Sequence, residues 1–173
     1  MKVILVFVST LNGKITRGDD PEVRHWSSES DKEHYMQIWK ESSLVIMGSN
    51  TYNDNIITPS PRRLILVMTR NPEKYNDRSI KGQVEFTNES PLGIVERYKS
   101  RFDLMTVVGG SKIASSFLKD SIIDELILTI EPIIFGQGID LLSGGEYEVR
   151  LKLLDIKRSN ENGTLITRYK ILK

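Results

Sequence analysis

The sequence contains no cysteine among its 173 residues, which excludes disulfide bonds, thiol nucleophiles and cysteine-based zinc sites. Histidine is scarce as well, and the two present, His25 and His34, are too few for a histidine-rich metal site. The 24 basic residues are almost balanced by 23 acidic ones, which argues against general nucleic-acid binding. No apolar run is long enough to cross a membrane. We therefore expect no metal, no nucleic acid and no membrane among its partners.

The composition that remains is typical of a globular protein, with 39% apolar and 27% charged residues. We predict a single domain over residues 1–173, because two independent domains of this length would each have a cramped core. The apolar opening, residues 1–8, could pass for a signal peptide. No cleavage region follows it, so we interpret it as a buried first strand and expect a cytoplasmic location.

Short apolar, β-branched runs alternate with helical patterns along most of the chain. The runs are typical of strands buried on both faces, and they lie at residues 3–8, 44–47, 64–68, 105–108 and 123–130. Helices are predicted to begin at the capping box Ser30-x-x-Glu33, at Ser90-Pro91 and at Ser111. Residues 59–61 and 71–82 are predicted to be surface loops, and both histidines are expected at the surface.

The end of the chain has a different pattern. Apolar and polar side chains alternate over residues 149–154 and 165–171, on either side of the turn Asn160-Glu-Asn-Gly163. This alternation predicts an antiparallel hairpin with one polar face. Together the patterns predict an α/β fold: a mixed sheet with helices on both faces and a C-terminal antiparallel hairpin.

Candidate ligand-binding residues follow three of the predicted strands. Ligands gather at the carboxyl ends of the strands in an open α/β sheet, where glycines permit close approach and helix starts favour phosphate. The three groups are Gly109, Gly110, Ser111 and Lys112; Gly48, Ser49, Asn50 and Thr51; and Thr69 with Arg70. A tight turn or a solvated arginine would explain each group alone, but three at one edge favour a shared dinucleotide site.

Two carboxylates are candidates for acid–base chemistry. Asp31 lies in the first turn of a predicted helix, five residues after Trp26, and Glu131 follows the apolar run that ends at Ile130. A structural explanation is open for each: an acid at a helix start is favoured by the helix dipole, and an acid at a strand terminus is common.

Residues 107–142 resemble the second half of dihydrofolate-reductase-like proteins, especially the reductase domain of the riboflavin biosynthesis deaminase-reductase. The glycine pair, the strand entry Ile123-Asp-Glu-Leu126 and Gly136-Gln-Gly138 occur in the order of that family. Residues 9–15 resemble its S-L-D-G-K-I motif, with Asn12 in place of the aspartate. The resemblance implies a dihydrofolate reductase-like, mostly parallel sheet of about eight strands, NADPH as coenzyme and a homodimer as a candidate assembly.

The resemblance also implies how NADPH would be held. The Gly109 to Lys112 group would hold the pyrophosphate, and the Gly48 to Thr51 group would line the adenosine half. Arg70 would meet the 2′-phosphate, because Ser49 stands where dihydrofolate reductases commonly have an arginine.

Two substrate classes remain open. In the riboflavin-type interpretation, Asn12, Trp26 and Ser28 contact the pyrimidine and sugar, with Glu131 nearby. In the folate-type interpretation, a pterin is bound by Trp26, Asp31, Tyr35 and Thr129, and the carboxylate supports protonation beside the hydride-accepting carbon.

The function implied is an NADPH-dependent reductase of a ribosylaminopyrimidine in riboflavin biosynthesis, acting by hydride transfer to a C=N carbon. The alternatives are a dihydrofolate reductase acting on a dihydropterin and a non-catalytic nucleotide-binding paralogue. The zinc deaminase signature needs cysteine, so a deaminating partner would be another polypeptide.

Overall fold

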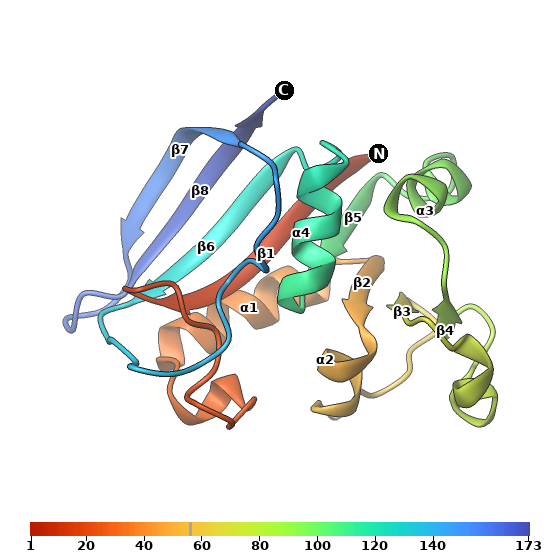
Figure 1. Cartoon of the computed structure of the whole chain (residues 1–173), viewed down its shortest axis with the longest axis horizontal. Coiled ribbons are helices and arrows are strands. Elements are labelled where there is room, and N and C mark those ends of the chain that lie inside the picture. The colour runs from red at the N-terminus through yellow and green to blue at the C-terminus, as the bar shows by residue number, and fades with distance from the viewer. Residues whose placement is uncertain (56) are drawn as a thin grey trace.

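The strands of the computed structural model form one eight-stranded sheet in the order β4-β3-β2-β5-β1-β6-β8-β7 (Figure 1). The structure describes residues 1–55 and 57–173. The strands are β1 (Lys2–Thr10), β2 (Leu44–Gly48), β3 (Leu64–Met68), β4 (Val84–Thr87), β5 (Leu104–Val107), β6 (Glu125–Glu131), β7 (Arg150–Arg158) and β8 (Leu165–Leu172). Strands β1 to β6 pair in parallel, whereas β7 and β8 form an antiparallel hairpin. The predicted mixed sheet with its C-terminal hairpin is confirmed.

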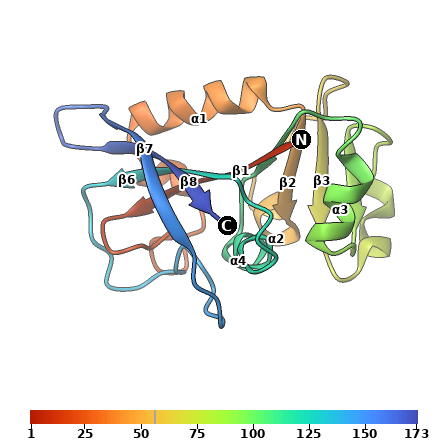
Figure 2. The same ribbon diagram turned by 90° about the horizontal axis from the view of Figure 1, so that it is seen from above.

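Helices cover both faces of this sheet, as predicted. They are α1 (Glu29–Glu41), α2 (Ser49–Asn53), α3 (Pro91–Tyr98) and α4 (Ser111–Lys119), with short 3-10 helices η1 (Val23–His25) and η2 (Pro72–Arg78). Figure 2 shows α1 alone on one face, with α3 and α4 on the other. Within the described residues, no helix has the length and apolar character that a membrane crossing requires.

The two faces of the sheet carry separate buried clusters, and strand β1 contributes to both. Val3 and Leu5 pack with the cluster that contains Phe117 of α4, whereas Ile4 and Val6 pack with Ile38 of α1. A strand with apolar contacts on both faces needs apolar residues at every position, which explains the uninterrupted run at residues 3–8.

The structure differs from the sequence prediction at two helix starts. Helix α1 begins after Ser28, not Ser30: Ser28 has extended backbone angles, and its Oγ accepts a hydrogen bond from the Asp31 amide at 3.3 Å. Helix α4 begins after Gly110, which has no side-chain cap, and Ser111 is its first residue. Ser90 caps α3 as predicted.

Strand β4 and the 3-10 helix η2 are among the elements that the sequence did not predict. Strand β4 has only four residues, too few for a clear periodic pattern. Residues 72–78 form the 3-10 helix η2, where a plain surface loop was predicted, because Pro72 stands at its first turn and presets a helical φ.

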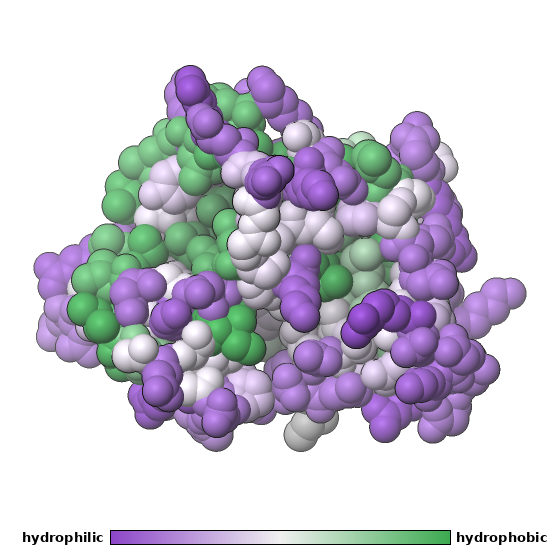
Figure 3. Space-filling model, viewed as in Figure 1, coloured by the Kyte–Doolittle hydropathy of each residue, from purple (hydrophilic) through white to green (hydrophobic). Residues whose placement is uncertain are grey.

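The hairpin has one charged face and one apolar face, and on the apolar face the side chains of β7 are exposed while Ile171 of β8 packs in the core. Cross-strand pairing places Leu153 beside Tyr169 and Leu151 beside Ile171, and Ile156 beside Thr167. Leu151, Leu153 and Ile156 are 43%, 46% and 52% exposed. The apolar area at the upper left of Figure 3 covers this part of the molecule. We call Leu151, Leu153, Ile156 and Tyr169 the apolar hairpin face.

Two loops, residues 11–18 and 132–141, are joined by a ladder of backbone hydrogen bonds. The amide of Ile15 donates to the carbonyl of Ile139 at 2.8 Å, and the amide of Leu141 donates to the carbonyl of Gly13 at 2.8 Å. Gly138 allows this approach: it has φ +147°, and a Cβ built there would lie 2.1 Å from the carbonyl oxygen of Thr16. Only glycine fits at this position without moving one loop away from the other.

We expect Gly138→Ala to lower the free energy of unfolding by about 1–3 kcal/mol, because it adds backbone strain and a collision with Thr16. Urea unfolding would measure the loss. Gly136→Ala is the matched control, since a Cβ at Gly136 meets no atom within 4 Å. Equal stability of the two variants would contradict the role given to Gly138.

Candidate functional site

A large cleft opens at the carboxyl ends of the parallel strands. Its volume is about 1370 Å³. All ten residues predicted to hold a coenzyme line it: Gly48, Ser49, Asn50, Thr51, Thr69, Arg70, Gly109, Gly110, Ser111 and Lys112. The three groups come from the ends of β2, β3 and β5, so the sheet does bring them to one place.

The order of the strands explains why the groups meet. Strand β5 lies between β1 and β2, so the chain leaves β1 toward one side of the sheet and leaves β5 toward the other. Ligand sites form at such switch points. The amide of Gly48 donates to the carbonyl of Gly109 at 2.8 Å, and the amide of Val108 donates to the carbonyl of Ile46 at 3.0 Å. The ends of β2 and β5 are thus held side by side.

The glycines at these strand ends leave room that side chains would fill. A Cβ at Gly110 would lie 3.3 Å from Thr51 Oγ1, and a Cβ at Gly48 would lie 3.1 Å from Ile113 Cγ1. Helix α4 starts here without a side-chain cap, and Figures 1 and 2 both show it beside α2. Free amides at the start of a nine-residue helix and an open backbone cradle fit the pyrophosphate of a dinucleotide.

Asp31 lies in the opposite wall of the same cleft, in the first turn of α1. Its side chain is buried, with 6% of the residue exposed. Burial raises the pKa of this carboxyl above its usual 3.8, the nearby hydroxyls of Thr129 and Ser27 act in the opposite direction, and the charge of Glu131 raises the pKa further. A carboxyl of this kind can hold a proton beside a ligand.

Thr129 and Tyr35 line the cleft next to Asp31. Tyr35 is one helical turn after Asp31, so both side chains lie on the same face of α1. Burial raises the pKa of Tyr35 to about 12, and this phenol therefore stays protonated and neutral at ordinary pH. Three of the four residues of the folate-type interpretation thus come together.

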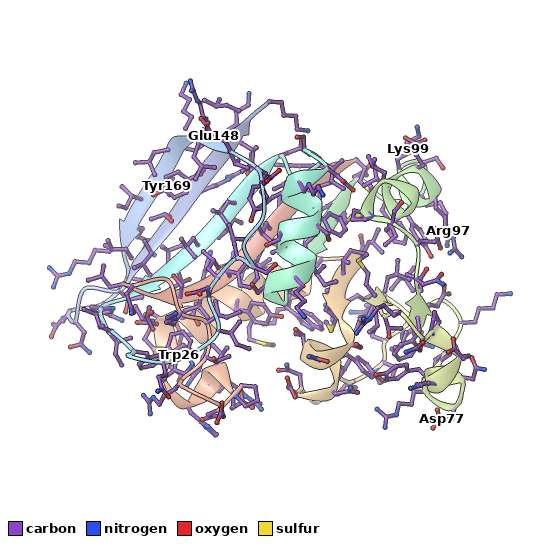
Figure 4. The ribbon with its side chains drawn as sticks, viewed as in Figure 1. Trp26, Asp77, Arg97, Lys99, Glu148 and Tyr169 are labelled. Atoms are coloured by element: carbon purple, nitrogen blue, oxygen red, sulfur yellow. The ribbon has the colours of Figure 1, made fainter. Side chains whose placement is uncertain are left out.

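The residues of the riboflavin-type interpretation lie elsewhere. Trp26, Ser28 and Glu131 line a separate hollow of about 380 Å³, and Figure 4 places Trp26 among the loops below β6. The Asn12 side chain is engaged inside the protein: Oδ1 accepts from Thr10 Oγ1 at 2.8 Å and Nδ2 donates to the carbonyl of Phe135 at 2.8 Å. Asn12 therefore joins two loops of the fold.

Several cleft residues were missed by sequence reasoning. His34 was expected at the surface, but it lines the cleft, and its Nε2 is buried with no hydrogen-bond partner among the described residues. Burial also lowers the pKa of His34. The Asp31-His34-Tyr35 spacing on one helix face was the signal that could have found it. Thr87 ends β4 and Asn88 and Glu89 follow it, and all three line the cleft as well; recognising that short strand would have identified them. His25 is exposed as expected and contacts Asp20 at 2.8 Å.

Comparison with known proteins identifies the family. The model of the RibD C-terminal domain matches residues 1–165. The chain belongs to this family. It is 28% identical over 165 residues to the uncharacterized protein YwjB of Bacillus subtilis, and the match covers 91% of each chain.

The fold of the RibD C-terminal domain recurs in solved structures. A Shewanella sp. PV-4 protein matches with a TM-score of 0.80 at 18% identity, covering 100% of both chains. A pyrimidine reductase-like protein of Corynebacterium diphtheriae has a TM-score of 0.76 at 18% identity, covering 99% of this chain and 92% of its own. A Thermotoga maritima diaminohydroxyphosphoribosylaminopyrimidine deaminase/5-amino-6-(5-phosphoribosylamino)uracil reductase has a TM-score of 0.75 at 20% identity, and the match covers 99% of this chain but 56% of that larger protein.

Membership of the RibD C-terminal domain family confirms the predicted resemblance to the reductase domain of riboflavin biosynthesis. It supports an oxidoreductase.

We expect Asp31→Asn to stabilise the protein increasingly as the pH rises. Because the pKa of Asp31 is raised on folding, the folded state binds this proton more tightly than the unfolded state. The cost in stability therefore grows from about pH 3.8 up to the raised pKa and stays constant above it. Asparagine has no such cost. The difference in the free energy of unfolding from wild type should therefore be larger at a pH of about 7 than at about 4.

Urea unfolding at the two pH values would measure this difference. Asp77→Asn, at an exposed position of η2, is the matched control and should show none of this pH dependence. If the stability difference between Asp31→Asn and wild type shrinks or stays constant as the pH rises, ionising the Asp31 carboxyl does not destabilise the folded protein, which would contradict the prediction.

Proposed function

We propose that the protein is an NADPH-dependent reductase that acts on a C=N carbon of a ribosylaminopyrimidine, as in riboflavin biosynthesis. One observation carries the proposal: the dinucleotide cradle and the buried Asp31 line the same cleft. The family membership supports it, since the RibD C-terminal domain is a reductase domain. Its cytoplasmic location stays a prediction from the sequence.

The two walls of the cleft would have different tasks. Gly109, Gly110 and the start of α4 would hold the pyrophosphate of NADPH, and Gly48 to Thr51 would line its adenosine half. Arg70 is exposed at the end of β3, within the same cleft, where its guanidinium can meet a 2′-phosphate. Bound NADPH would supply a hydride from its nicotinamide ring.

Asp31 would supply the proton that the reduced nitrogen requires. Its burial keeps the carboxyl protonated to higher pH than an exposed aspartate, and it lies beside Thr129 at the inner wall of the cleft. Val6, Phe7 and Val8 of β1 form the floor between the two walls. This apolar floor would exclude water and orient the ring against the coenzyme.

A dihydropterin is the second candidate substrate, and a specific observation favours it. Asp31, Tyr35 and Thr129 line the cleft, whereas Asn12, Trp26 and Ser28 do not. A carboxylate next to a threonine hydroxyl can pair with the adjacent N–H groups of a 2-amino heterocycle. A dihydropterin carries such an amidine group, whereas a uracil ring has a carbonyl in place of the 2-amino group.

Side-by-side assays of NADPH oxidation would test the reductase and choose its substrate. We expect turnover of a ribosylaminopyrimidine or a dihydropterin, and a loss of at least about a hundredfold in Asp31→Asn, because general acid catalysis contributes that much. Methotrexate should compete only if the pterin is the substrate. NADPH binding without oxidation of any compound would instead support the non-catalytic paralogue.

We expect Gly110→Val to weaken NADPH binding by at least about tenfold, which corresponds to about 1.4 kcal/mol. A side chain here would crowd Thr51 and fill the pyrophosphate cradle. Calorimetric titration with NADPH would measure the loss. Gly136→Val, where added atoms meet open space, is the control. Unchanged affinity in Gly110→Val would remove the coenzyme from this part of the cleft.

We also propose that the protein is a homodimer that uses the apolar hairpin face. A two-fold interface buries the same patch on both copies, so one apolar face suffices to form it. Three exposed aliphatic side chains of β7 contribute: Leu151, Leu153 and Ile156. Clusters of this kind on a monomer commonly mark protein–protein contacts.

Leu153→Lys should convert the dimer to a monomer, because a charge would be buried at the centre of the apolar hairpin face. Light scattering at several protein concentrations would measure the molecular mass. Leu92→Lys is the matched control, since Leu92 is 50% exposed on α3, away from that face. A monomeric wild type would contradict the proposal.

A further inference from the structure

Glu131 is a buried carboxylate that the proposed reaction does not use. It is the last residue of β6 and only 4% exposed. Within residues 1–55 and 57–173, no cation lies within ion-pair distance of it. Burying a carboxylate without a cation is costly unless hydrogen bonds satisfy its oxygens. Its partners therefore show what it does.

Both oxygens of Glu131 accept hydrogen bonds from neutral donors. Oε1 accepts from the amide of Ser28 at 2.8 Å and from Ser28 Oγ at 2.7 Å. Oε2 accepts from Thr164 Oγ1 at 2.6 Å. Ser28 is the N-cap of α1, and Thr164 lies just before β8. One carboxylate thus joins the end of β6, the start of α1 and the turn of the hairpin.

The hairpin turn is itself fastened to the start of α1. Asn160 donates through Nδ2 to Ser30 Oγ at 3.0 Å and to Thr164 Oγ1 at 2.8 Å. Ser30 Oγ also lies 3.0 Å from Ser159 Oγ. These bonds, with those of Glu131, determine the position at which α1 begins and the direction of its first turn.

Asp31 lies in that first turn, where its amide donates to Ser28 Oγ at 3.3 Å. The same serine therefore connects Glu131 to the backbone of Asp31. Asp31 lines the cleft and Glu131 does not, so the two carboxylates lie at one helix start but face different spaces.

We propose that Glu131 is a positioning residue: through Ser28 and Thr164 it fixes the first turn of α1 and so orients the Asp31 carboxyl in the cleft. Only the effect expected on turnover rests on the proposed function. Its charge has a second effect, because a nearby negative charge favours the protonated form of Asp31. The other groups that act on the titration of Asp31 are Thr129 of β6, Ser27, and Lys32 and Tyr35 of α1.

Glu131→Gln is the main test, because it keeps the size of the side chain and removes the charge. Carbon-13 NMR of the Asp31 carboxyl in the ligand-free protein would follow its titration. We expect the midpoint to fall by at least about half a pH unit. We also expect hydrogen exchange of the Ser28 and Asp31 amides to quicken. Neither measurement requires activity, so the result stands apart from the proposed reaction.

Glu125→Gln is the matched control. Glu125 is at the other end of the same strand, where it pairs with Lys2 and Arg168 at 2.6 Å each. The control should leave both the Asp31 midpoint and the two amides as in wild type. A midpoint and amide exchange unchanged in Glu131→Gln, or changed equally in Glu125→Gln, would overturn the proposal.

Thr164→Val keeps the proposal testable if Glu131→Gln fails to fold. It removes one donor to Glu131 and leaves the charge, so the Ser28 and Asp31 amides should exchange faster. Thr167→Val is its control, because Thr167 is equally buried on β8 but donates to the carbonyl of Leu128. Equal amide exchange in the two threonine variants would overturn the proposal.

Turnover provides the last readout. In Glu131→Gln we expect kcat at neutral pH to fall by about threefold or more, with KM for NADPH unchanged, since less of Asp31 is protonated and the coenzyme wall is untouched. Wild-type protein without any turnover would refute the reductase, while the NMR titration would still decide the role of Glu131.

Discussion

The hydrogen bond from the Gly48 amide to the Gly109 carbonyl holds two strand ends at one spot, and the candidate site depends on it. The bond exists because β5 is inserted between β1 and β2. It also requires residues without side chains, since a Cβ at Gly110 would already contact Thr51. Where the backbones approach this closely, the open start of α4 faces the cleft with its amides free of any side-chain cap. The dinucleotide cradle is thus a consequence of strand order and of missing side chains.

The opposite wall of the cleft depends on a different constraint, the exact turn at which α1 starts. A helix places side chains at intervals of about 100°, so a start displaced by two residues would turn Asp31 and Tyr35 away from the cleft. Ser28 sets the start, and Glu131 and the hairpin turn hold Ser28 in place. The C-terminal hairpin therefore contributes to the site although none of its strand residues lines the cleft among those described. It does so by supporting the helix from outside.

The sequence was sufficient to predict the parallel strands and the residues at their carboxyl ends. The strand runs and the glycines after β2 and β5 could be predicted, because buried parallel strands have a plain apolar signature and their carboxyl ends share one edge. The choice between Ser28 and Ser30 as the N-cap could not be predicted, since both serines precede the same apolar face. Strand β4 was too short to show a pattern.

The direction in which a side chain points was beyond the sequence. Asn12 lies in a loop motif of the family, where we expected it to contact the substrate. Its side-chain amide instead forms hydrogen bonds with Thr10 and Phe135. The sequence made Asp31 and Glu131 equal candidates for acid–base chemistry. In the structure they differ in the hydrogen bonds that each carboxyl accepts. Glu131 accepts three hydrogen bonds from Ser28 and Thr164, whereas burial outweighs the hydroxyls beside Asp31 and raises the pKa of that carboxyl. Two acids at one helix start can therefore differ in role: Glu131 holds the start of α1 through its hydrogen bonds, and Asp31, whose pKa is raised by burial, faces the cleft.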